Sequence, residues 1–241
     1  MAYNFLGLVN EVNRRLNEVE LTSSNFASAV GFYSQVKDSV NAAIQEIDQE
    51  YPEWPYNFVE QEDTLTNGIT RYSFPANATV LDFESFRVKE DTTLGNRTQK
   101  LQVLSYEEYL DRFVEQEYTS DTSLRSVPVY VAKGHGLEYI LSPAPNKAYT
   151  LVYEYYLTST DLIDSTDVPK IPEIYRNVVV DGAMHYAYMF RGNTQDAMVA
   201  EKKFKDGLKN MRIVLINKNT YVRSTMLTRT QRSTYVYRLA S

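Results

Sequence analysis

The sequence contains no cysteine, which excludes disulfide bonds, thiolate metal sites and cysteine nucleophiles. Such a chain fits synthesis in a reducing cytoplasm. Long apolar runs are missing as well: no stretch of about 18 consecutive apolar residues occurs, so we expect no membrane-spanning helix. The first residues lack a basic segment followed by an apolar one, so we expect no secretory signal.

The motifs of phosphate binding and catalysis are also missing. Neither G-x-G-x-x-G nor G-x-x-x-x-G-K-[ST] is present, and no G-x-S-x-G supports a Ser-His-Asp triad, which would need one of the two histidines, His135 or His185. Three aspartates at positions 161, 164 and 167 lack the spacing and the glycine of an EF-hand loop, so a solvated loop is the better interpretation. We therefore expect no catalytic residue, no cofactor and no metal site.

Charge is distributed unevenly along the chain. The net charge of the whole sequence is −6. The segment from Gly207 to the end has no acidic residue and carries seven basic ones: Lys209, Arg212, Lys218, Arg223, Arg229, Arg232 and Arg238. The body of the chain is therefore strongly acidic and its C-terminal part is basic, which favours docking of that part onto an acidic protein surface.

Tyrosine is unusually frequent, with 20 residues among 241. Tyrosine is favoured at protein–protein interfaces because it offers a large contact area and one polar tip. Packing inside a β-rich region is an equally good explanation, and the sequence leaves both open.

Four segments repeat apolar residues every three or four positions, which is the pattern of helices with one buried face. They run from Phe5 to Val19, from Val36 to Tyr51, from Tyr175 to Met189 and from Ala200 to Leu215. The short break RGNT (191–194) suits an antiparallel pair formed by the last two, with Asn193 or Thr194 as the cap of the final helix. Within the third segment, small residues such as Gly182 should let a neighbouring helix approach closely.

The middle of the chain shows strand patterns. The segments are 69–74, 79–90, 128–133, 137–142 and 149–158, and the last alternates its side chains with the period of two that a strand requires. One helix is expected within this region, because Ser105 and Glu108 have the spacing of a capping box.

The order of these elements predicts an α+β fold: a four-helix bundle with an inserted β-rich module, sandwich- or barrel-like, and an extended C-terminal arm. Residues 1–60 would form the first half of the bundle and residues 61–164 the inserted domain. Residues 165–216 would complete the bundle, and residues 217–241 would form the arm.

The stretch YPEWPYNF (51–58) lies where the first helix pair gives way to the β-rich region. Pro52 removes a backbone donor and disfavours helix at the preceding residue, and Pro55 keeps the chain extended. Between them is Trp54, the only tryptophan. We predict that Pro52, Trp54 and Pro55 form a junction plug, a packed aromatic corner between the two parts, and we assign no ligand to it.

A series of structural motifs follows in residues 136–192. It comprises a strand, a Pro-x-Pro turn, a Tyr-rich strand, an acidic loop containing leucine, and Ile-Pro-Glu-x-Tyr opening a helix with Gly-Ala. The positions are Pro143, Pro145, Tyr153, Tyr155, Leu162, Ile171, Pro172, Glu173, Tyr175, Gly182 and Ala183. In this order they resemble the head-to-tail adaptor proteins of tailed bacteriophages, of the tail tubular protein A type, over most of residues 1–216.

The resemblance implies a structural, non-enzymatic protein of the virion tail or neck, made in the cytoplasm of the bacterial host. It implies a ring of about a dozen copies that joins the portal protein to the tail nozzle protein. Genomic DNA would pass through the ring without specific binding, and no membrane would be involved. Our candidates for portal contacts are residues of the basic arm, chosen on composition: Arg223, Arg229, Arg232, Tyr235, Tyr237 and Arg238.

Two other functions stay open at this stage. A β-rich tail component that binds a receptor or carbohydrate would use Tyr and Trp to stack on sugars. A DNA-binding accessory protein would use the basic, tyrosine-bearing tail for phosphate contacts and base stacking.

Overall fold

The computed structural model describes residues 2–90, 97–118 and 121–216, so the predicted arm, residues 217–241, lies outside the described part. The fold is α+β, as predicted. The helices of the described residues are α1 (Phe5–Arg15), α2 (Phe32–Glu50), α3 (Tyr106–Tyr118), α4 (Arg176–Phe190) and α5 (Thr194–Leu215), with short 3₁₀ turns η1 (Pro55–Asn57), η2 (Thr122–Leu124) and η3 (Glu173–Tyr175). The strands are β1 (Phe58–Thr64), β2 (Arg71–Ser73), β3 (Ala78–Glu90), β4 (Arg97–Lys100), β5 (Gln102–Leu104), β6 (Tyr130–Lys133), β7 (Glu138–Ser142) and β8 (Thr150–Leu157).

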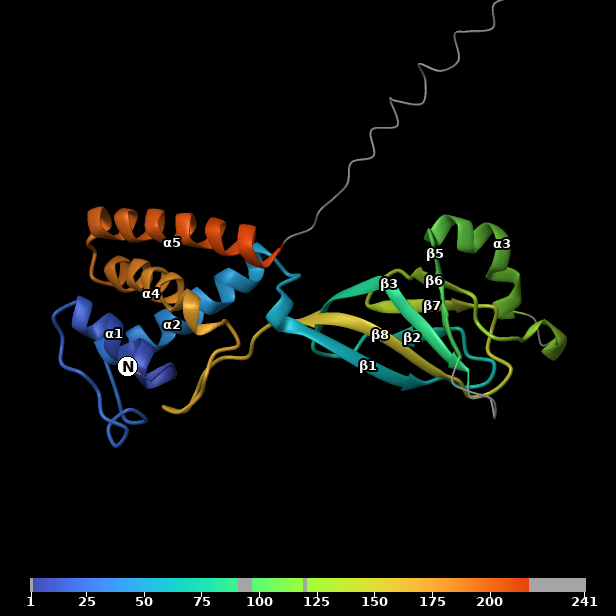
Figure 1. Cartoon of the computed structure of the whole chain (residues 1–241), viewed down its shortest axis with the longest axis horizontal. Helices are drawn as coiled ribbons and strands as arrows, with labels where there is room; N and C mark the ends of the chain where they lie inside the picture. The colour runs from blue at the N-terminus through green and yellow to red at the C-terminus, as the bar shows by residue number, and fades with distance from the viewer. Residues whose placement is uncertain (1, 91–96, 119–120, 217–241) are drawn as a thin grey trace, which may run out of the picture.

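The elements gather into two lobes (Figure 1). We call α1, α2, α4 and α5 the helical lobe, and β1–β8 with α3 the sheet lobe. The chain leaves the helical lobe after α2, builds the whole sheet lobe, and returns after β8. Outgoing β1 and returning β8 are antiparallel neighbours, with Phe58 opposite Tyr156, so the two connections run side by side.

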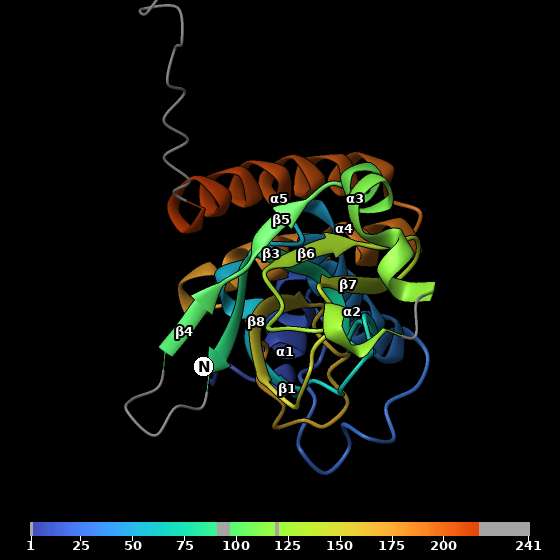
Figure 2. The same ribbon diagram turned by 90° about the vertical axis from the view of Figure 1, so that its right-hand side faces the viewer.

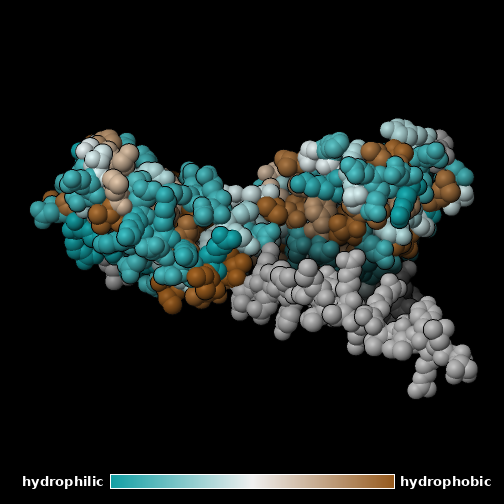
Figure 3. Space-filling view, turned by 90° about the horizontal axis from the view of Figure 1, so that it is seen from above, coloured by the Kyte–Doolittle hydropathy of each residue, from teal (hydrophilic) through white to brown (hydrophobic). Residues whose placement is uncertain are grey.

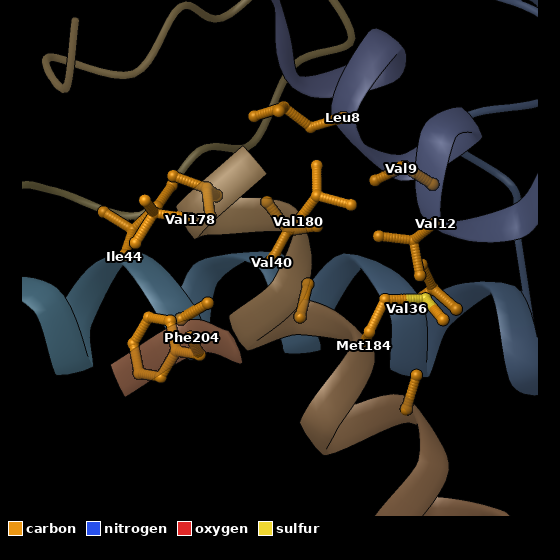
Figure 4. Close-up of a cluster of buried hydrophobic side chains, with 14 of the residues drawn as sticks. Leu8, Val9, Val12, Val36, Val40, Ile44, Val178, Val180, Met184 and Phe204 are labelled. Carbon is orange, nitrogen blue, oxygen red and sulfur yellow. The ribbon is translucent and has the colours of Figure 1, made fainter. Parts of the chain in front are cut away.

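The helical lobe has one hydrophobic core to which all four of its helices contribute. Figure 4 shows its centre, where valines of α2 and α4 meet side chains of α1 and Phe204 of α5. The predicted close helix approach is confirmed at Gly182, because a Cβ there would be 2.9 Å from the Phe204 ring and 3.0 Å from the Cβ of Ala43. The predicted cap of α5 is also confirmed: the side chain of Asn193 accepts a hydrogen bond from the backbone N–H of Asp196.

Two helix ends test the sequence patterns. Helix α2 ends at Glu50 and Tyr51 is extended, as the following Pro52 predicts. The prediction that the first helix reaches Val19 is wrong, because α1 ends at Arg15 and Val19 is exposed. Asn17 takes a left-handed backbone conformation with φ of 57°, which reverses the chain one turn earlier than the apolar repeat indicates.

The sheet lobe consists of two four-stranded sheets with the orders β1-β8-β3-β4 and β2-β7-β6-β5. All strand pairs are antiparallel except β5 with β6. The inner faces share one core, in which Phe86 of the first sheet stacks on Tyr153 and meets Tyr139 of the second. Among the described strands no barrel closes, so the barrel form of the prediction is wrong.

Helix α3 covers the outer face of the second sheet, as both ribbon views show (Figures 1 and 2). Its first turn has the predicted capping box: the backbone N–H of Glu108 donates to Ser105 Oγ at 3.2 Å, and the Glu108 carboxylate accepts from Ser105 N–H at 3.4 Å. Tyr109 then buries its ring against Ala132 and Ile140. The short helix therefore completes a third layer over the two sheets.

Candidate functional site

The predicted junction plug lies where the two lobes meet. Trp54 is fully buried and belongs to the core of the helical lobe. Its Nε1–H donates to the carbonyl of Ile47 at 2.7 Å, and its ring stacks on Tyr56 with centroids 5.8 Å apart. Tyr51 meets the same ring edge-on. Because Pro52 stops α2 and Pro55 starts η1, the indole folds back onto the last turn of the helix it follows.

A buried carboxylate beside the plug holds both connections between the lobes. Asp48 of α2 accepts a hydrogen bond from Asn57 Nδ2 at 2.9 Å on the outgoing connection. It accepts another from the backbone N–H of Ser159 at 2.8 Å on the returning one. The Tyr56 hydroxyl makes a third, longer contact of 3.3 Å, and burial, followed by the charge of Asp48, raises the pKa of Tyr56. The Asp48 side chain thus links both connections between the lobes, which we call the hinge, to the helical lobe.

A groove runs along the helical lobe next to the plug. It has a volume of about 370 Å³ and lies between α2 and the C-terminal half of α5. Its walls include Trp54, Phe204 and Leu208 below, and charged side chains of both signs at the rim: Glu46, Glu50, Lys205, Lys209 and Arg212. Arg212 also covers the ring of Tyr51 at 5.1 Å. The groove therefore lies immediately before the point where the described chain ends.

The outward side of α5 forms a surface that we call the basic face: Met198, Val199, Lys202, Lys203, Lys209 and Ile213. One acidic residue, Asp206, is exposed on the same side of the helix. The three apolar side chains of the basic face are 57–69 % exposed. Figure 3 looks onto this side of the molecule and shows hydrophobic side chains interspersed among hydrophilic ones on the helical lobe. Within the described chain, the three lysines make no ion pair, whereas neighbouring Lys205 is paired with Glu201.

A second mixed surface lies on the segment that returns from the sheet lobe to α4. We call it the acidic segment: Asp161, Ile163, Asp164, Val168, Glu173 and Ile174. Its three apolar side chains are 61–81 % exposed. Internal bonds fix its backbone, because the carboxylate of Asp167 accepts hydrogen bonds from the N–H groups of residues 163 and 164, both at 2.8 Å. The Asp167 carboxylate thus stabilises the turn of this loop by binding its backbone N–H groups.

The acidic segment is tied to α1 and α2. Phe5 N–H donates to the Asp167 carbonyl at 2.7 Å, and Leu6 N–H donates to the Ser165 carbonyl at 3.1 Å. From α2, the Asn41 side chain both donates to and accepts from the backbone of Leu162. The acidic segment is therefore held in a fixed position on the surface of the helical lobe.

In the sheet lobe, α3 is fastened by a charge cluster. Arg71 donates to both carboxylate oxygens of Glu117, at 2.9 and 3.1 Å, and to Glu138 at 2.8 Å. Burial works against the charged form of Glu117, but interactions with Arg71, Tyr109 and Thr70 together outweigh it, so the pKa of Glu117 lies below its usual value. This bidentate pair holds the last turn of the helix on the sheet.

The described tyrosines favour the packing explanation over a surface role. Only Tyr118 among them is largely exposed, and Tyr139 and Tyr153 lie at the centre of the sheet core. Burial, followed by interactions with Asp63, raises the pKa of both phenols. Because Trp54 is buried too, the described part of the chain offers few aromatic platforms for a sugar.

The described residues contain no cluster of three or more side chains that could together hold a metal ion. His185 Nδ1 lies 3.0 Å from the carbonyl of Ala197, and His135 packs on the Tyr106 ring at 4.2 Å. Both histidines therefore have structural contacts. Within the same residues, no helix combines the length and apolar character needed to cross a membrane.

Of the three predicted plug residues, Trp54 is buried in the core of the helical lobe, whereas Pro52 is half-buried and Pro55 is exposed. The arm candidates Arg223, Arg229, Arg232, Tyr235, Tyr237 and Arg238 lie outside the described residues. Sequence reasoning missed Asp48 and Asn57. The only signal for Asp48 was an acidic residue directly beside the apolar stripe of α2, one position after Ile47.

A comparison with protein families gives one match that spans nearly the whole chain. The family model described as SU10 adaptor protein matches residues 3–232. No curated protein matches the chain. The match covers both lobes, the hinge between them and both mixed surfaces.

Proposed function

The chain belongs to the SU10 adaptor protein family, a family of bacteriophage head-to-tail adaptors, and on that premise we propose that it joins the portal to the tail nozzle as a ring of identical subunits. The family match over residues 3–232 is the observation that carries this proposal. The tail tubular protein A type, named from the sequence resemblance, is a finer assignment that we retain as part of the proposal. So is the absence of enzymatic activity.

In this proposal α1, α2, α4 and α5 act as a four-helix bundle that forms a collar of about a dozen copies. The sheet lobe, with domain boundaries near residues 60 and 164, projects from the collar. The single core of the helical lobe supports a rigid collar, and the paired connections at the hinge support a fixed projection. The junction plug of Pro52, Trp54 and Pro55 would set the angle between the two.

The arm, residues 217–241, is the proposed portal anchor. Helix α5 ends at Leu215, beside the groove lined by Arg212, and the basic charge continues beyond it. The body of the chain is acidic, so DNA would pass the channel during packaging and ejection without binding to it, because like charges repel. Arg223, Arg229, Arg232 and Arg238, with Tyr235 and Tyr237, would supply the portal contacts.

Co-sedimentation with portal rings of the same phage tests the proposal. The full chain should load at about one copy per portal subunit, and the chain truncated after Ile216 should not. A matched control replaces exposed basic residues of the sheet lobe, Lys100 and Lys133, with serine, and should load like the unchanged protein. Undiminished loading of the truncated chain would refute the arm as anchor, and failure of the full chain to load would refute the portal-joining function.

A further inference from the structure

The two mixed surfaces of the helical lobe have an excess of opposite charge, and each exposes three apolar side chains. The basic face of α5 presents three unpaired lysines among exposed Met198, Val199 and Ile213. The acidic segment presents the carboxylates of Asp161, Asp164 and Glu173 among exposed apolar side chains. Glu173 is paired with Arg176, and Asp161 accepts a hydrogen bond from Gln45. Neither surface is of one sign, since Asp206 is exposed on the basic face and Lys170 is exposed within the acidic segment. The excess charge nevertheless has opposite sign on the two surfaces, and exposed apolar side chains beside such an excess are typical of a surface that binds a complementary partner.

The two surfaces lie on different sides of the lobe. Helix α5 packs on α4, which in turn packs on α2, and the groove described above lies between α5 and α2. The acidic segment is bonded to α1 and to Asn41 of α2. In Figures 1 and 2 the layer of α2 and α4 separates α5 from the returning segment. One copy therefore cannot bring its own basic face onto its own acidic segment.

We propose that the basic face of one copy binds the acidic segment of the next copy. Opposite charges give the contact its orientation, and the exposed apolar side chains supply its buried area. Two different surfaces on opposite sides make a head-to-tail contact, which closes into a ring when the rotation between neighbours divides a full turn. This inference rests on the proposed function insofar as it specifies how the collar is assembled.

Charge reversal gives a test with an internal rescue. One variant carries Lys202→Glu and Lys203→Glu, and the other carries Asp161→Lys and Asp164→Lys. Each variant alone would place like charges against each other, so each should load portal rings at least about tenfold more weakly than the unchanged protein. An equimolar mixture should recover loading, because every contact in an alternating ring is then complementary.

The matched control reverses charges away from both surfaces, at the exposed Asp111 and Glu115 of α3, and should leave loading unchanged. Circular dichroism and thermal unfolding check that each variant folds. Normal loading by either variant alone would overturn the inference while leaving the adaptor function intact. Two folded variants that stay inactive when mixed would also overturn it.

A second test needs no portal and uses the absence of natural cysteines. A chain carrying Lys202→Cys together with Asp164→Cys should form a ladder of disulfide-linked trimers and larger species on oxidation. Either single-cysteine chain should stop at monomer or dimer. Lys202→Cys combined with Lys133→Cys on the sheet lobe is the matched control. Equal ladders from both double variants would contradict the assigned surfaces, whatever the portal experiment shows.

Discussion

Replacing Asp48 with alanine should destabilise the helical lobe by about 4 kcal/mol, because two buried donors lose their acceptor. Asn57 Nδ2 and Ser159 N–H both donate to this carboxylate with distances under 3 Å, at 2.9 and 2.8 Å. A buried donor left without an acceptor costs about 1–3 kcal/mol, and bonds to a charged acceptor lie at the upper end. For a chain of this size the loss corresponds to a decrease of about 8–16 °C in Tm.

Urea unfolding followed by tryptophan fluorescence measures this loss directly. Trp54 is the only tryptophan, and its indole lies in the helical core beside Asp48, so its emission reports on the lobe in question. Asp48→Asn should cost about half as much, since one amide oxygen remains to accept from Asn57.

Asp38→Ala is the matched control, because Asp38 is an exposed acidic residue on the same helix, and it should change stability by no more than about 0.5 kcal/mol. A loss below about 1 kcal/mol for Asp48→Ala would refute the hinge role, since it would mean that water or a relaxed backbone satisfies both donors. A double-mutant cycle with Asn57→Ala should show coupling of about 1 kcal/mol or more, as expected for residues in direct contact.

Three further predictions concern packing and titration. Gly182→Ala should lower the free energy of unfolding, measured by urea titration, by about 1 kcal/mol, because the clash with Phe204 outweighs the gain in helix propensity. A more stable variant would contradict the tight contact. Glu117 has a lowered pKa, so its pairing with Arg71 contributes fully to the free energy of unfolding above about pH 5, and this contribution is lost as the pH falls through the folded-state pKa. Glu117→Gln should therefore flatten the acid side of the curve of stability against pH. An unchanged acid side would argue against the pairing. Burial and the hydrogen bond to Glu46 raise the pKa of Tyr186 to about 12, so this phenol contributes stability below about pH 10 that is lost as the pH rises toward 12. Tyr186→Phe should lack that loss, measured as the difference in unfolding free energy between pH 9 and 11. The same difference in both proteins would count against the assignment.

Local patterns predicted the helices well. The stop at Tyr51 follows from Pro52, the cap at Asn193 from its side chain, and the close approach at Gly182 from its missing Cβ, all of which act within a few residues. The early end of α1 was missed because the apolar repeat continues to Val19, although the backbone reverses at Asn17. A periodic pattern shows which residues suit a helix, whereas the end of the helix depends on one backbone conformation.

Contacts between distant segments were beyond reach of the sequence. Asp48 holds Ser159, which is 111 positions away, and no local pattern indicates that pairing. The charge of the basic face was visible in the sequence, but only the fold shows that the acidic segment lies on the other side of the lobe. The two-sheet arrangement was similarly open, because alternating strands suit a sandwich and a barrel equally well.

The measurement that tests the account most directly is sedimentation of the purified chain, alone and mixed with portal rings from the same phage. The account predicts co-sedimentation at about one adaptor per portal subunit, saturating sharply at that ratio because the subunits close a symmetric ring. A chain that stays at the top of the gradient in the presence of portal rings would contradict the proposed function.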